Sequence, residues 1–198
     1  MKYTNNVFIN CPFDDDYEPL FHSIVFAVHD AGFIARCALE VSDATKNILA
    51  SIMRIISDCK YGIHDISLTE LDKDNKLPRF NMPLELGIFF GCERFGVGKH
   101  RKKSCLVLDR EPYRYQKFIS DIAGREVRPH GNEQKQVIRE VRNWLRTASR
   151  RTTIPGGEVI WKRFNQFERD LPDICEDLQL QVNELTFVDY RDVVVEWL

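Results

Sequence analysis

The chain alternates between short β-prone runs and longer stretches whose apolar residues recur at helical spacing. A strand–helix alternation of this kind predicts a mostly parallel sheet with helices on both faces. The third β-prone run is apolar almost throughout, as expected of a parallel strand that is covered on both sides. The β-prone runs cover residues 7–11, 33–39, 61–66, 104–109 and 126–129. The helical stretches cover residues 17–31, 45–58, 82–95, 113–123 and 133–149.

The order of the strands follows from the way parallel strands are connected. Crossovers between them are almost always right-handed, which leaves few arrangements for five such units. We therefore expect an α/β fold, a flavodoxin-like doubly wound parallel five-stranded sheet in the order 2-1-3-4-5. Asp14, Asp15 and Asp16 supply favourable negative charge at the start of the first helix. Ser42 or Asp43 can cap the second helix.

An interior stretch at residues 150–157 (RRTTIPGG) has the composition of a linker. We assign residues 1–149 to the α/β domain and residues 158–198 to a C-terminal, mainly helical extension. The extension reads as a helix over 158–180, followed by a helix or strand over 185–198. It is too apolar to remain in water, so we expect it to pack on the domain or on a partner chain. The apolar side chains are Phe164, Phe167, Phe187, Val193, Val194 and Trp197.

The composition argues against a nucleic-acid-binding, membrane, disulfide-bonded or metal-binding protein. A net charge of −2 makes nucleic acid an improbable partner, because such binding usually shows as a strong basic excess. No stretch approaches the ~20 apolar residues of a membrane span and no leader precedes the first strand, so we expect a cytoplasmic protein without membrane contact. The six cysteines lack close pairing and are expected to be reduced. The five histidines lack metal-ligand spacing, so we expect no metal site.

Polar side chains gather where the expected strands end. In the order 2-1-3-4-5 the connections change direction between strands 1 and 3, which opens a crevice at their carboxyl ends. Asp65 ends the third strand, and Glu85 is expected in the first turn of the helix that follows. The other residues expected at this crevice are Asn10, Asp14, Ser67 and Asn81.

Two carboxylates at one crevice suggest chemistry on a glycosidic bond. Glu85 near a helix start should stay ionised, because the free N–H groups and the dipole favour an anion. Such an anion suits the positive anomeric carbon that forms when a ribosyl bond loosens, as nucleophile or stabiliser. Asp65 would be the second acid, or would hold the ribose hydroxyls. The alternative reading is that Glu85 only satisfies the helix start and Asp65 only caps a loop.

Other polar residues admit both a binding and a structural interpretation. Asn10 and Asp14 could bind sugar or phosphate, or could cap a turn and the first helix. Arg36 could neutralise a phosphate or form a salt bridge within the sheet. Asp109 could contact a base or ribose, or cap the loop after the fourth strand. The basic run at residues 99–103 is interpreted as a solvated turn.

Three motifs carry a resemblance to a known family. The run VFINCPFDDDY at 7–17, then DIS at 65–67 and NMPLELG at 81–87, resembles the nucleoside 2-deoxyribosyltransferase-like proteins and the related TIR-like domains. The resemblance covers about residues 5–130 and implies that Asp65 and Glu85 serve a glycosidic bond as the catalytic pair. The chain departs from the transferases, which usually carry a G-T-A-like stretch before the glutamate, and it lacks the TIR-typical Ser-x-Trp-Cys.

The resemblance implies cleavage or transfer of the N-glycosidic bond of a nucleoside, a nucleotide or NAD. NAD would then be a substrate, and no cofactor is expected. Relatives of this kind often act as NAD-depleting effectors in bacterial antiviral defence, and activity can depend on a homo-oligomer or an activator protein, here through the C-terminal extension. Two alternatives stay open: a module that binds a nucleotide signal without turning it over, and an interaction scaffold.

Overall fold

The computed structural model describes residues 2–41, 47–71 and 76–198. The expected helix cap at Ser42 or Asp43 lies outside these residues. Within them, the N-cap of α2 (Ile48–Asp58) is Asn47, whose side-chain oxygen accepts the backbone N–H of Ala50 at 3.0 Å. Asn47 thus satisfies one of the N–H groups that a helix start leaves free.

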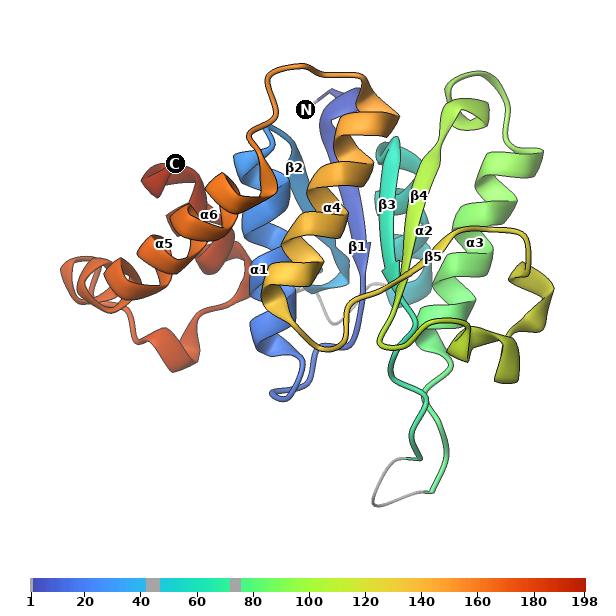
Figure 1. The fold of residues 1–198 in the computed structure, drawn as a ribbon, viewed down its shortest axis with the longest axis horizontal. Coiled ribbons are helices and arrows are strands. Elements are labelled where there is room, and N and C mark those ends of the chain that lie inside the picture. The colour runs from blue at the N-terminus through green and yellow to red at the C-terminus, as the bar shows by residue number, and fades with distance from the viewer. Residues whose placement is uncertain (1, 42–46, 72–75) are drawn as a thin grey trace.

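The five strands form one parallel sheet in the order β2-β1-β3-β4-β5 (Figure 1). This confirms the predicted flavodoxin-like α/β arrangement. The register pairs Asn10 of β1 with His64 of β3, so the two strands end side by side. The strands are β1 (Asn6–Asn10), β2 (Ile34–Cys37), β3 (Tyr61–Asp65), β4 (Ser104–Asp109) and β5 (Val127–Pro129).

Helices cover both faces of the sheet. On one face lie α1 (Glu18–Asp30) and α4 (Gln134–Ser149), which share a core with Ile9 and Ile63. On the other face lie α2 and α3 (Asn81–Phe95), which pack against Phe8. Because side chains alternate along a strand, Asp65 shares its face with Ile63, and His64 points the opposite way. His64 is buried between Phe8 and Phe89, as expected of a packed histidine.

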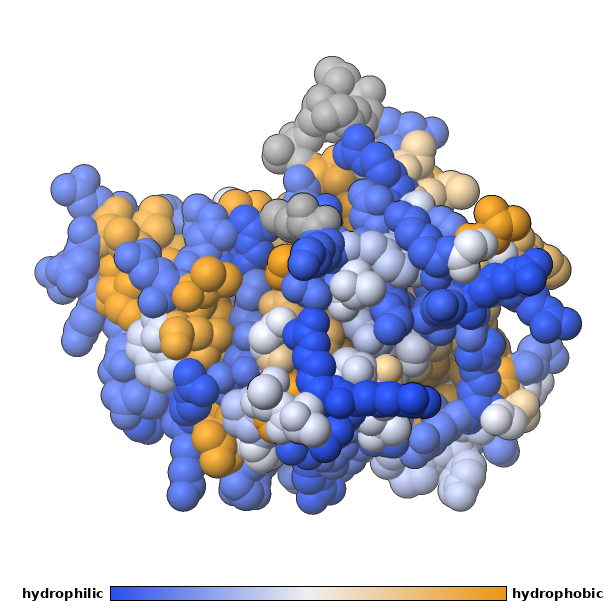
Figure 2. Space-filling view, turned by 90° about the horizontal axis from the view of Figure 1, so that it is seen from above, coloured by the Kyte–Doolittle hydropathy of each residue, from blue (hydrophilic) through white to orange (hydrophobic). Residues whose placement is uncertain are grey.

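The C-terminal helices extend the core on the α1 side of the sheet. Phe26 of α1 packs against Phe164 of α5 (Gly157–Asp177), with ring centroids 5.4 Å apart. Tyr190 of α6 (Phe187–Trp197) packs against Phe167 of α5 at 5.7 Å. In Figure 2 hydrophobic surface also gathers at the end of the molecule built by these helices, on the left. The buried face of the extension therefore belongs to the main core.

Two local expectations are wrong. Residues 113–123 form no α-helix but two 3-10 turns, Arg114–Lys117 and Ser120–Ile122, anchored by the buried Tyr115 and Ile122. A helix this short is marginal unless a continuous apolar face packs it. The basic run at 99–103 is not wholly solvated either. Lys103 is buried, and its Nζ donates to the carbonyls of Ile56, at 2.6 Å, and Cys59, where α2 ends.

Within the described part of the chain, no helix combines the length and the apolar character that crossing a bilayer requires. All six cysteines are free thiols.

Candidate functional site

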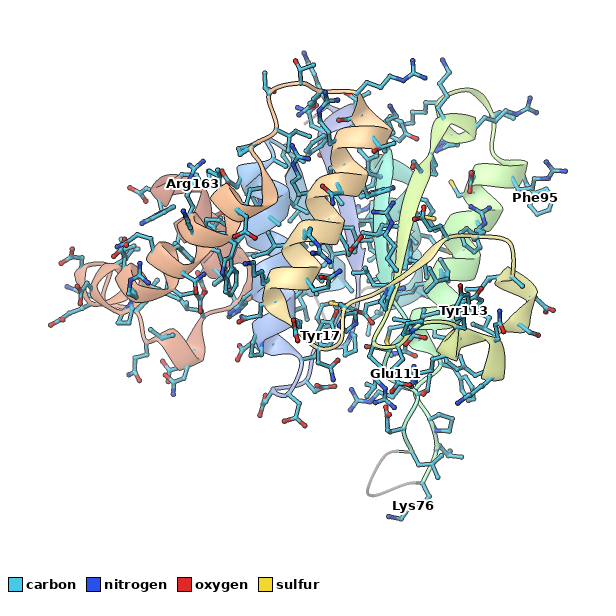
Figure 3. All side chains as sticks on the ribbon, viewed as in Figure 1. Tyr17, Lys76, Phe95, Glu111, Tyr113 and Arg163 are labelled. Carbon is cyan, nitrogen blue, oxygen red and sulfur yellow. The ribbon has the colours of Figure 1, made fainter. Side chains whose placement is uncertain are left out.

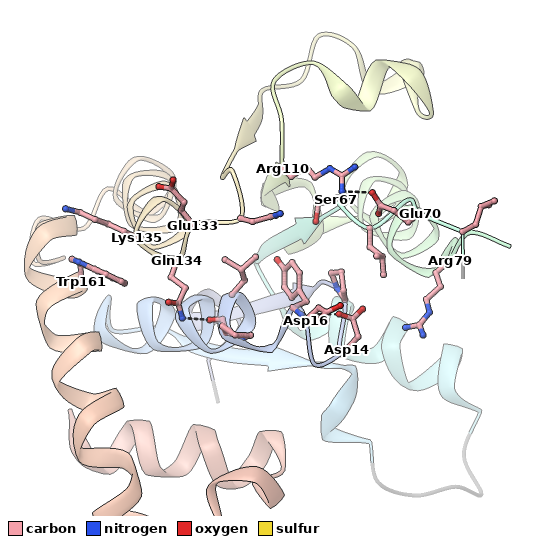
Figure 4. A pocket seen from close by; sticks show the side chains of 17 residues that line it. Asp14, Asp16, Ser67, Glu70, Arg79, Arg110, Glu133, Gln134, Lys135 and Trp161 are labelled. Atoms are coloured by element: carbon pink, nitrogen blue, oxygen red, sulfur yellow. Dashed lines mark hydrogen bonds and ion pairs between the residues drawn. The ribbon is translucent and has the colours of Figure 1, made fainter. Parts of the chain in front are cut away.

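A cleft of about 1040 Å³ opens at the carboxyl edge of the sheet, where β1 and β3 end (Figure 4). This is the point at which strand order reverses, and open α/β sheets bind ligands there. The loop after β1 and the start of α1 supply one wall. The segment after β3 supplies another, with Arg110 beyond β4. Residues 132–135 at the start of α4, together with Trp161 of α5, complete the lining.

Asp65 lies fully buried behind this cleft, at the end of β3. Its Oδ2 accepts the hydroxyl of Tyr17 at 2.5 Å and lies 3.0 Å from Nε2 of His130. Its Oδ1 accepts the backbone N–H of Ser67 at 2.8 Å. Figure 3 shows Tyr17 at the carboxyl edge of the sheet, near the start of α4. Both carboxylate oxygens are therefore already bonded within the protein.

These contacts decide the ionisation of Asp65. Burial alone would raise its pKa, but the His130, Ser67 and Tyr17 contacts outweigh burial and lower the pKa below its ordinary value. His130 accepts the backbone N–H of Asn132 at Nδ1, so its ring proton sits on Nε2 and faces the carboxylate. Asp65 is thus an anion held by its contacts with Tyr17, Ser67 and His130.

Asp65 also ties together three walls of the cleft. Tyr17 and Ser67 line the cleft and bond to Asp65 directly, whereas Asn132 lines it and is held through His130. These residues come from the start of α1, the loop after β3 and the loop before α4. The carboxylate therefore sets the shape of the cleft without facing it.

Glu85 has the opposite environment. It is the fifth residue of α3, so the expectation that it lies in the first helical turn is wrong. It has 9% of its surface exposed, and within the described residues its carboxyl has no hydrogen-bond or ion-pair partner. Its oxygens are not fully enclosed, since they are absent from the completely buried unpaired atoms. Burial raises the pKa of Glu85 to about 7, so the expected permanent anion is also wrong.

The two acids approach the sheet edge from opposite faces. Asp65 faces α1 and α4, and Glu85 comes from α3 on the other face. Neither residue lines the cleft. The buried thiol of Cys11 lies close enough to feel both: burial first, and then the charges of Asp65 and Glu85, raise its pKa well above the ordinary value.

Two of the other expected site residues line the cleft. Asp14 lines it and also accepts the backbone N–H of Tyr17 at 3.1 Å, which closes the turn before α1. Ser67 lines it close to Asp65. Asn81, the first residue of α3, is exposed and is not part of the lining.

The remaining expected residues make hydrogen bonds and ion pairs within the fold. Asn10 donates to the carbonyl of Met82 at 2.9 Å and contacts Nδ1 of His64 at 3.0 Å, which fastens the start of α3 to β1. Nε of Arg36 donates to both carboxylate oxygens of Glu40, at 2.7 and 2.8 Å. Asp109 is buried in an ion pair with Arg114 at 2.7 Å and accepts the backbone N–H of Arg110. None of these three lines the cleft.

Sequence reasoning missed His130, Tyr17 and Trp161. His130 follows β5 directly, so the rule that placed Asp65 at the carboxyl edge could have placed His130 there as well. The contribution of Trp161 had no such signal, because it depends on how α5 docks. Among the described residues, no group of three or more histidine, cysteine, aspartate or glutamate side chains could hold a metal ion.

The fold and the cleft define a doubly wound α/β protein with a ligand-sized opening at its switch point. Comparisons with known family models, with curated proteins and with solved structures find no match to this chain.

Proposed function

We propose that the protein binds a nucleoside, a nucleotide or NAD in the cleft and cleaves or transfers its N-glycosidic bond. The observation that carries the proposal is the carboxyl of Glu85, which has no partner among the residues that the structure describes and whose pKa is raised by burial to about 7. A group that is half protonated near neutral pH can donate a proton to a leaving group and recover it. A second carboxylate held ionised at the same edge of the sheet, as Asp65 is, gives two acids with divergent pKa values, which is typical of acid–base sites.

The chemistry follows from these two protonation states. Protonated Glu85, which is not part of the lining, gives its proton to the departing base through one intervening water as the bond to the anomeric carbon breaks, and the bonding electron pair leaves with the base. Water, or a second base in a transfer reaction, then attacks the positive anomeric carbon. Asp65 does not contact the ligand in this scheme. Its oxygens accept hydrogen bonds from Tyr17 and Ser67, and it holds these two lining residues in place. It is a positioning residue in this scheme.

The cleft suits a ligand of this kind. Its volume of about 1040 Å³ lies just above the roughly 300–1,000 Å³ typical of small-molecule sites. Its lining mixes acids such as Asp14 and Asp16, which can accept ribose hydroxyls, with bases such as Arg79 and Arg110. Arg110 is already paired with Glu70.

The test is base release from NAD and from a panel of nucleosides, followed by chromatography. We expect Glu85→Gln to lower the rate by roughly 10²- to 10⁴-fold, the usual contribution of a general acid. Glu93→Gln is the matched control, since Glu93 lies further along α3 and pairs with Arg125 at 3.2 Å. A proton donor with this pKa also predicts activity that declines as the pH rises above about 7. Equal rates in the two variants would refute the role of Glu85.

A second candidate function is binding without turnover. It is favoured by one observation: neither Asp65 nor Glu85 lines the cleft. Calorimetric binding of a nucleotide with no base released, at any pH from 5 to 8, would select this candidate.

A further inference from the structure

The C-terminal helix α5 contributes an aromatic side chain to the cleft. Trp161 lies in the first turns of α5 and lines the cleft together with Gln134 and Lys135 of α4. Figure 4 shows Trp161 and Lys135 at one end of the cleft, with Glu70 and Arg79 at the other. The extension therefore builds part of the candidate site and does not only cover the core.

Trp161 is placed there by the packing of α5. The buried stripe of this helix is Ile160, Phe164, Phe167 and Leu171, and Trp161 lies on its flank. The indole packs beside Phe164, with ring centroids 5.9 Å apart, and remains partly exposed. One side of the indole is thus supported by the core while the side chain borders the cleft.

Two polar contacts fix this end of the cleft. Lys135 pairs with Glu158 at 2.9 Å, which joins the start of α4 to the first turn of α5. Gln134 donates to the carbonyl of Pro19 at 3.0 Å, which joins the start of α4 to α1. The first contact holds the helix that carries Trp161 to α4, and the second holds α4 to α1.

Trp161 is also the more available of the two aromatic residues in the lining. The other is Tyr17, which is only 6% exposed and whose hydroxyl is committed to Asp65. A partly exposed indole beside a polar cleft suits a planar ring, because aromatic faces stack on bases whatever the base sequence.

We propose that Trp161 is the platform on which the base of a nucleotide ligand stacks, so that the C-terminal extension determines recognition of the base. The proposal rests on the nucleoside class of ligand put forward above.

The first experiment uses tryptophan fluorescence of the full chain. The probes are the four nucleoside 5′-monophosphates and NAD, with ribose 5-phosphate as the probe that lacks a base. We expect the base-bearing probes to quench the fluorescence and ribose 5-phosphate to leave it unchanged. Trp161→Phe should abolish the quenching. Trp197→Phe should retain it, because Trp197 of α6 bonds to Asp170 and does not line the cleft.

The second experiment measures affinity by calorimetry. Trp161→Ala should raise the Kd for the probe that binds best by roughly 5- to 140-fold, as expected for the loss of one stacked base. Trp161→Phe should recover most of this loss. Thermal unfolding followed by circular dichroism checks that each variant folds, and the phenylalanine variant keeps the test valid if the alanine variant does not.

The outcomes separate this proposal from the proposed function. Quenching through Trp161 without base release supports the stacking platform and refutes the glycosidase. Base release with unchanged kinetics and affinity in Trp161→Ala refutes the platform and leaves the glycosidase standing. Quenching that persists in Trp161→Phe, or binding of none of the five base-bearing probes, overturns the platform.

Discussion

The carboxyl groups on the two sides of the sheet have pKa values that are shifted in opposite directions. On the α1 and α4 side, the carboxylate of Asp65 is enclosed and accepts Tyr17 and Ser67, with His130 3.0 Å away. On the α3 side, the carboxyl of Glu85 is nearly as buried but has no partner within the described residues. The first pKa is lowered and the second is raised to about 7. Burial alone therefore does not set ionisation; the donors supplied by neighbouring loops decide it.

The comparison assigns different roles to the two residues. An anion whose oxygens are hydrogen-bonded within the protein stabilises the fold, because its removal leaves buried donors without an acceptor. An unpaired carboxyl that still touches solvent can exchange its proton, because nothing in the protein fixes its charge.

The largest effect is expected on the Asp65 side. Asp65→Ala leaves the buried hydroxyl of Tyr17 and the backbone N–H of Ser67 without their acceptor, and it removes the carboxylate 3.0 Å from Nε2 of His130. We expect a loss of about 3–5 kcal/mol in the free energy of unfolding, measured by urea denaturation at pH 7. Asp16→Ala, an exposed acid of the same cleft, should change it by no more than about 0.5 kcal/mol. Similar losses in the two variants would show that the network around Asp65 adds no stability.

The pH dependence of that loss has a definite sign. The folded pKa of Asp65 is lower than the unfolded value near 3.8, so its ionisation stabilises the fold above pH 3.8. The difference between wild type and Asp65→Ala should therefore stay constant from pH 5 to 8 and shrink as the pH falls below about 4.

A smaller effect of opposite sign is expected on the Glu85 side. The folded pKa of about 7 exceeds the ordinary 4.5, so between these values the unfolded chain releases a proton that the folded chain retains. Stability then falls as the pH rises through this window. Glu85→Gln cannot ionise, and it should be more stable than wild type by about 1–3 kcal/mol at pH 8.

At pH 4 that advantage should vanish, because Glu85 is protonated in both states. Urea denaturation at the two pH values measures it, with Glu93→Gln as the control on the same helix. A Glu85→Gln variant that is less stable than wild type at pH 8 would mean that the carboxylate has a partner in solution.

The strand order could be predicted from the sequence because it depends on periodicity and on the handedness of crossovers, both of which are local. Asp65 could be placed at the sheet edge for the same reason. The partners of Asp65 could not, because Tyr17 and His130 lie 48 and 65 positions away and meet it only through tertiary packing. The protonation state of Glu85 could not be predicted either. Glu85 lies just beyond the first turn of α3, where the free N–H groups of the helix start no longer stabilise its charge and the side chain is buried.

The most direct measurement is the pKa of Glu85 itself. Carboxyl-carbon NMR of protein labelled with ¹³C-glutamate, with Glu85→Gln to assign the resonance, follows its titration from pH 3 to 9. The account predicts a midpoint of about 7. A midpoint near the ordinary value of 4.5 would leave Glu85 ionised at neutral pH, with no proton to give to a leaving base, and would contradict it.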